Sequence, residues 1–175
     1  MILDLKGESE MDAVIGRLYS MVDGNYQRLK SIVAGMSQEE LEYKGPNQNF
    51  NSTAQLLRHL AYVDLRWVFR IKGEVIPIKL EEKYGPMLDG NNQLPELKAP
   101  SLTVLLNEYD EVISMIKSLC YQLKDEHLNQ IVKYKKGNEA TVQWGIWHIA
   151  DHSRYHQAHI NQLRKWYSDS CRVSE

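Results

Sequence analysis

Four of the six histidines lie in one stretch of twelve residues, from His148 to His159. At about 100° per residue, positions 148, 152, 156 and 159 of a helix fall within a stripe roughly 80° wide. Histidines on neighbouring turns of one face bring their rings to one point, which is what a metal ion needs. A row of hydrogen-bonded histidines in the core or at an interface is the alternative. Four on one stripe favour the metal, and Trp144, Tyr155 and Leu163 on or beside the stripe indicate that it faces inward.

The histidine content favours a catalytic over a structural metal site. A helical bundle builds such sites from side chains of facing helices. His59 lies at the margin of another apolar stripe, beside Arg66 and Arg70, and alone would be an ordinary surface or core-edge histidine. Structural zinc normally takes four ligands and favours cysteine, whereas catalytic sites keep open positions. Imidazole suits Zn, Ni, Cu or Fe(II), so the identity of the metal stays open.

Several other chemistries find no support in the sequence. Glu-x-x-His pairs, His-Glu-x-x-His, Gly-x-Ser-x-Gly and a Gly-rich phosphate loop are all absent, which counts against di-iron, zincin, acyl-serine and nucleotide chemistry. An open metal site lowers the pKa of a bound water or thiol and so produces a nucleophile at neutral pH. Water as the nucleophile gives a hydrolase and a small thiol gives an S-transferase. Spacing alone does not separate the two.

Composition indicates an ordinary globular protein. The 175 residues are 43% hydrophobic and 25% charged, with a formal net charge of -2, so nucleic acid is not expected as a partner. No apolar run approaches the roughly 18 residues of a membrane helix. Asp4 interrupts the apolar start that a secretory signal would need, and two cysteines cannot form a disulfide framework. We expect one cytoplasmic domain spanning residues 1–175, with a small-molecule substrate and no membrane partner.

The periodicity predicts an all-α fold. A short helix after Ser37, a polar segment over 124–140 containing His127 and a short extended stretch, and a frayed tail from Ser168 to Glu175 complete the chain. The link over 72–100 is too long for a tight hairpin and too rich in Gly and Pro for a long helix. It therefore allows parallel helices on either side, as in a four-helix bundle with a long crossover. The four long helices are expected over 10–34, 52–71, 101–123 and 141–167.

Two segments together resemble the DinB/YfiT-like superfamily. They are Gln55-Leu56-Leu57-Arg58-His59-Leu60-Ala61 and His152-Ser153-Arg154-Tyr155-His156-Gln157-Ala158-His159-Ile160. The order of elements agrees over nearly the whole chain. The resemblance implies an up-down-down-up bundle, often dimeric, in which one histidine of the second long helix and a His-x3-His pair of the fourth bind a divalent metal. By position, these ligands are His59, His152 and His156.

The last segment departs from the His-Arg-Gly-Gln ending of many DinB-type members and is closer to the YfiT type. His159 and His148 are then expected beside the ligands or on the substrate side. With Asn25, a polar residue in the apolar face of the first long helix, they are the candidates for holding a ligand's second ring nitrogen or for contacting substrate. These three are also the candidate catalytic residues.

The resemblance implies two enzymatic functions. Characterised relatives include metal-dependent transferases and isomerases that use bacillithiol, mycothiol or glutathione, and YfiT-type members are described as metal-dependent hydrolases. We expect S-transfer by an activated small thiol, with a possible homodimer. A cationic pocket from Arg58, Arg66 or Arg70 would favour this function, whereas a carboxylate or His159 near a metal-bound water would favour hydrolysis. The alternative from another class is a non-catalytic bundle that binds metal or uses its histidines structurally.

Overall fold

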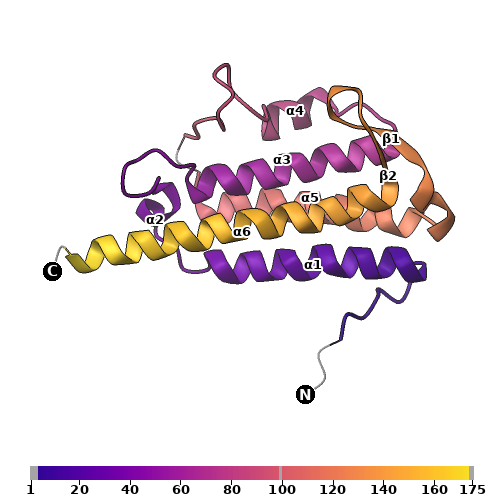
Figure 1. The fold of residues 1–175 in the computed structure, drawn as a ribbon, viewed down its shortest axis with the longest axis horizontal. Helices are drawn as coiled ribbons and strands as arrows, with labels where there is room; N and C mark the ends of the chain where they lie inside the picture. The colour runs from indigo at the N-terminus through magenta and orange to yellow at the C-terminus, as the bar shows by residue number, and fades with distance from the viewer. Residues whose placement is uncertain (1–3, 99, 174–175) are drawn as a thin grey trace.

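Four long helices lie side by side in the computed structural model, which describes residues 4–98 and 100–173 (Figure 1). Met1, Ile2 and Leu3, and the end of the expected tail at 174–175, lie outside the described residues. The long helices are α1 (Ala13–Val33), α3 (Thr53–Lys72), α5 (Leu102–Gln122) and α6 (Val142–Val173). The shorter elements are α2 (Gln38–Glu42), α4 (Ile78–Tyr84), the 3-10 helices η1 (Asp125–Asn129) and η2 (Lys135–Gly137), and the strands β1 (Ile131–Lys133) and β2 (Glu139–Thr141).

The long helices follow the expected up-down-down-up order (Figure 1). α1 and α6 run the same way, α3 and α5 run the opposite way, and the crossover with α4 links α3 to α5. The strands form an antiparallel pair, with Val132 opposite Ala140, at the end of the bundle where α6 begins. The predicted all-α four-helix bundle is therefore confirmed, and no helix among the described residues is long and apolar enough to cross a membrane.

Side-chain caps fix the starts of the helices where the sequence predicts them. Ser52 and Gln55 form a reciprocal capping box at α3, and Ser101 accepts the backbone N–H of Val104 at α5. The hydroxyl of Thr141 accepts the backbone N–H of Trp144 at 3.1 Å. Such caps satisfy donors that the first helical turn leaves unpaired, which fixes the register of the residues that follow.

The link over 72–100 contains the short helix α4, whose Tyr84 is buried and donates its hydroxyl to the carbonyl of Glu108 at 2.9 Å. Two expectations need correction. α6 continues to Val173 rather than ending near Tyr167, so most of the expected tail is helical. Tyr155 does not face inward, because its side chain is 62% exposed. It lies at the solvent edge of the histidine stripe, where helical periodicity alone does not show whether a side chain is buried or exposed.

The core contains one buried carboxyl group. Asp64 on α3 is fully buried, and its Oδ2 accepts the Tyr109 hydroxyl of α5 at 2.6 Å, whereas its Oδ1 has no hydrogen-bond partner. Burial disfavours the charged form and raises the pKa of Asp64 to about 8, although the bond from Tyr109 acts in the opposite direction. Asp64 is therefore largely neutral at pH 7.

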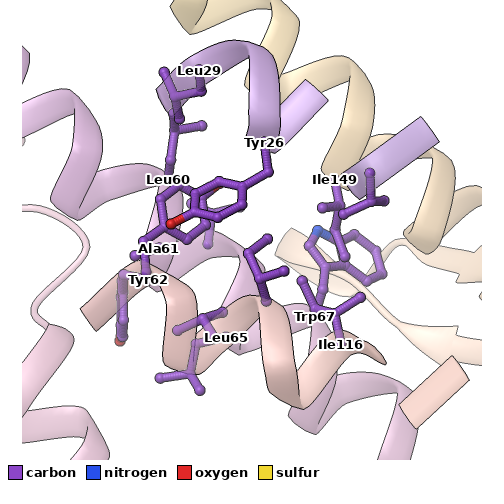
Figure 2. Packing of buried hydrophobic residues seen from close by; sticks show 14 of the residues in the cluster. Tyr26, Leu29, Leu60, Ala61, Tyr62, Leu65, Trp67, Ile116 and Ile149 are labelled. Carbon is purple, nitrogen blue, oxygen red and sulfur yellow. The ribbon is translucent and has the colours of Figure 1, made fainter. Parts of the chain in front are cut away.

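Trp67 on α3 packs against Gly145 on α6. The ring of Trp67 is buried in the core beside Ile149 and Ile116 (Figure 2). A Cβ atom at Gly145 would lie 2.7 Å from Cε3 and Cζ3 of this ring, closer than van der Waals contact allows. Glycine at 145 thus lets the indole approach the backbone of α6, which brings α3 and α6 close together.

Substitution of this glycine should destabilise the fold. We expect Gly145→Ala to lower the free energy of unfolding by about 1–3 kcal/mol, because the ring or the helix must shift. Gly24→Ala on α1 is the matched control: a Cβ there meets nothing within 4 Å. It should raise the stability by about 1 kcal/mol through helix propensity. Urea denaturation of both variants measures the difference, and equal effects would refute the close approach at Gly145.

Candidate metal centre

Three imidazoles from two antiparallel helices meet between α3 and α6. His59 comes from α3, and His152 and His156 come from adjacent turns of α6. The Nε2 atom of His152 lies 3.3 Å from that of His59 and 3.1 Å from that of His156. One nitrogen of each ring lies within 4.8 Å of the others, so a single ion could contact all three. No carboxylate or thiol of the described residues joins this group.

The three rings are held as neutral imidazoles. Burial is the main cause that lowers the pKa of His59 to about 4 and those of His152 and His156 to about 3. Neighbouring histidines add to the effect at His152 and His156, and the charge of Lys135 adds to it at His59 and His152. At neutral pH the rings are therefore uncharged, and each has one nitrogen with a lone pair, which is the ligand form of histidine.

The outer nitrogens of the three rings differ in their surroundings. The Nδ1 atoms of His59 and His152 are buried and have no hydrogen-bond partner in the protein, whereas Nδ1 of His156 lies 3.4 Å from Nδ1 of His159. When Nε2 binds an ion, Nδ1 keeps the ring proton. The converging Nε2 atoms therefore fit a metal, and His159 is placed to orient the ring of His156.

The other two candidates lie elsewhere. The side-chain amide of Asn25 donates to the backbone carbonyl of Ala150 at 3.0 Å. The backbone carbonyl of Asn25 accepts from the side-chain amide of Gln157 at 2.9 Å. It therefore ties α1 to α6 rather than contacting a histidine. His148 stacks on His152 with ring centroids 5.5 Å apart and makes no hydrogen bond to it. Neither residue holds a second ring nitrogen of the cluster.

Sequence reasoning placed Trp144 on or beside the histidine stripe but missed Tyr134 and Lys135, which the hairpin brings to this end of the cluster. Tyr134 follows β1 and stacks on Trp67 with centroids 5.3 Å apart, and Trp144 stacks on His148 at 4.7 Å. Trp144 is signalled by its position one turn before His148 on the same stripe. Tyr134 and Lys135 lie in a short polar segment without helical period, so no local pattern points to them.

A small pocket lies at the opposite end of the cluster. It encloses about 200 Å³, and its walls are mostly apolar. His159, which contacts His156, forms part of the wall. The pocket therefore has room for an uncharged group of a ligand beside His159, although the three converging histidines do not line it. The other residues that line it are Phe50, Asn51, Leu56, Gln162, Leu163 and Trp166.

Comparison with known proteins agrees with this geometry. The family model of the DinB superfamily matches residues 21–160, which includes all three converging histidines. A Bacillus subtilis (strain 168) protein, named uncharacterized protein YkkA, is 48% identical over 168 residues, which is 95% of this chain and 95% of that protein. The chain belongs to the DinB superfamily.

Proposed function

We propose that this protein is a metal-dependent transferase that activates a low-molecular-weight thiol for S-transfer to an electrophile. The observation that carries the proposal is the convergence of three neutral imidazoles without a carboxylate. The ion would be Zn, Ni or Fe(II), and it would be held by His59, His152 and His156. When bound, a divalent ion at such a site supplies a positive charge that lowers the pKa of a coordinated thiol or water.

The surroundings of the histidines support a thiol rather than water as the nucleophile. A free thiol has a pKa of about 8.5, so it loses its proton far more readily than water and needs no dedicated base. A water nucleophile would gain most from a neighbouring general base. His159 contacts the outer nitrogen of His156 rather than the converging Nε2 atoms, and no described carboxylate joins them. Hydrolysis therefore has weaker support.

The cations near the cluster add to this support. Arg58 pairs with Glu108 at 2.7 Å and is already neutralised, so it is excluded from the expected cationic pocket. Arg66 and Arg70 make no ion pair within the described part of the chain. They could therefore receive carboxylates of a small thiol, which favours S-transfer over hydrolysis.

The metal site can be tested by composition. Protein purified without a metal-affinity tag and supplied with Zn, Ni or Fe(II) should hold about one equivalent, because three imidazoles form one site. His156→Ala should lose most of it, whereas His127→Gln, at a histidine outside the cluster, should retain it. Elemental analysis of the dialysed proteins gives the answer. Metal-free wild type after loading would contradict the site.

The depressed pKa values predict how acid affects the metal-free protein. Folded His152 has a pKa of about 3, whereas an ordinary histidine titrates near 6.5. The unfolded chain therefore binds the extra proton as pH falls below 6.5, and stability is lost. In the His152→Gln variant, the free energy of unfolding should therefore fall less steeply as pH decreases, by roughly 1 kcal/mol per pH unit between about pH 6.5 and pH 5. Urea denaturation of wild type and variant across this range measures how the free energy of unfolding depends on pH. The same dependence in both proteins would contradict the prediction.

Activity distinguishes the two enzymatic functions. Metal-loaded wild type should accelerate the consumption of bacillithiol or glutathione by a model alkylating electrophile, because coordination increases the thiolate fraction. His156→Ala should lose this acceleration, and His127→Gln should keep it. Metal-dependent cleavage of a model ester or amide without any thiol would instead support hydrolysis. Stoichiometric metal with neither activity would support a non-catalytic metal-binding bundle.

A further inference from the structure

We propose that Arg66, Arg70 and Lys135 form an anion-binding subsite at the hairpin end of the histidine cluster, which takes a carboxylate or phosphate group of the ligand. The proposal rests on the proposed function for what this ligand does at the histidines. The subsite itself depends only on the arrangement of these three cations. It names the substrate class as a molecule that carries an anionic group some distance from its reacting atom.

The two arginines continue the line of His59 along α3. Arg66 and Arg70 follow His59 by seven and eleven residues, which places all three on one face of the helix. At 1.5 Å per residue, the arginine Cα atoms lie about 10 and about 16 Å along the axis from that of His59. Long side chains can span part of this distance. A ligand could therefore contact the histidines and the arginines together.

Aromatic rings hold the Arg70 side chain. Its guanidinium lies 4.3 Å from the ring centroid of Trp67 and 5.1 Å from that of Tyr134. A guanidinium packed against rings in this way keeps its N–H groups available at the edge of its plane. The same aromatic layer reaches the cluster, because Trp144 packs against Trp67 and stacks on His148.

The third cation comes from the hairpin that precedes α6. Lys135 begins η2, between the two strands. Its pKa is lowered by burial and by the charges of Arg66 and Arg70, and its own charge lowers the pKa values of His59 and His152. Its Nζ atom lies 5.8 Å from the ring centroid of Tyr134, and the guanidinium of Arg70 lies 5.1 Å from the same ring, so Lys135 and Arg70 are neighbours across this ring.

No carboxylate forms an ion pair with these three neighbouring charges in the described residues, although carboxylates pair with seven other lysines and arginines. The seven are Lys30, Lys44, Arg58, Lys83, Lys117, Lys124 and Arg164. Within residues 4–98 and 100–173, no ion pair includes Arg66, Arg70 or Lys135. Arg66 contacts Sδ of Met87 at 3.9 Å and lies 5.8 Å from the ring centroid of Tyr62, a residue to which it is also hydrogen-bonded. Glu81, which shares a surface pocket with Arg66, accepts the hydroxyl of Tyr62.

Clustered like charges repel one another, so such a cluster is retained at a cost unless an anion neutralises it. Guanidinium groups bind carboxylates and phosphates in a bidentate manner, and an ammonium adds a point charge. Both anions therefore fit the chemistry. The histidine cluster adds no negative charge that would repel them, since no carboxylate joins it.

The subsite can be tested without the metal. In His156→Ala protein, stripped of metal, titration with succinate and with inorganic phosphate should shift the indole N–H signals of Trp67 and Trp144 in NMR spectra. Trp166, which packs on Phe50 at the opposite end of the cluster, is the internal reference. Arg70→Gln or Lys135→Gln in this background should weaken binding roughly tenfold, as expected for a lost charge-assisted hydrogen bond.

Lys72→Gln on α3 and Lys133→Gln on β1 are the matched controls, and both should bind as the parent does. A stronger response to succinate identifies a carboxylate ligand, and a stronger response to phosphate identifies a phosphate ligand. No response to either probe, or equal weakening in the controls, overturns the subsite. Arg66→Gln should also bind the anions more weakly. Circular dichroism of each variant shows whether the helices are intact, so that weaker binding can be attributed to the lost contact and not to unfolding.

The outcome is independent of the proposed function. Anion binding in the metal-free protein supports the subsite even if wild type holds no metal or transfers no thiol. The converse outcome is wild type that holds one equivalent of metal and consumes thiol while the metal-free protein binds neither anion. That result would support the proposed function and contradict the anion-binding subsite.

Discussion

The close approach of α3 to α6 is the constraint on which the rest of the site depends. Gly145 lets the Trp67 ring pack against the backbone of α6, and the two helices run antiparallel from this contact. About two turns further along, the same spacing brings His59 within 3.3 Å of His152. A wider separation would expose the rings to water and restore their ordinary basicity. One glycine thus supports both the geometry and the protonation state of the cluster.

The charges around the histidines work in the same direction as burial. Lys135 disfavours protonation of His59 and His152, so the hairpin keeps protons off the cluster while adding a positive charge at its edge. A ligand that brings a negative charge to this edge would weaken that effect. Anion binding and the basicity of the histidines are therefore linked through the same lysine, and each should influence the other.

The sequence predicted the parts of the structure that local patterns specify. The histidine stripe follows from helical period, and Ser52 and Ser101 mark helix starts because their caps are made within one turn. His59 gained weight only from the histidine stripe as a possible partner site and was assigned as a ligand through the family resemblance, because its partners are 93 residues or more away. Tyr134 and Lys135 could not be found, since a long-range contact with Trp67 gives them their positions. The side chain of Tyr155 was misplaced because periodicity does not define the edge of a stripe.

The buried carboxyl of Asp64 and the partly buried histidines link the stability of the metal-free protein to pH in opposite directions. The pKa of Asp64 is raised, so its contribution is full below its ordinary value of 3.8 and declines as pH rises towards about 8. The three histidines act oppositely, because their stabilisation is lost as pH falls below 6.5. A cation bound to the three rings would oppose their protonation and so reduce the loss of stability in acid.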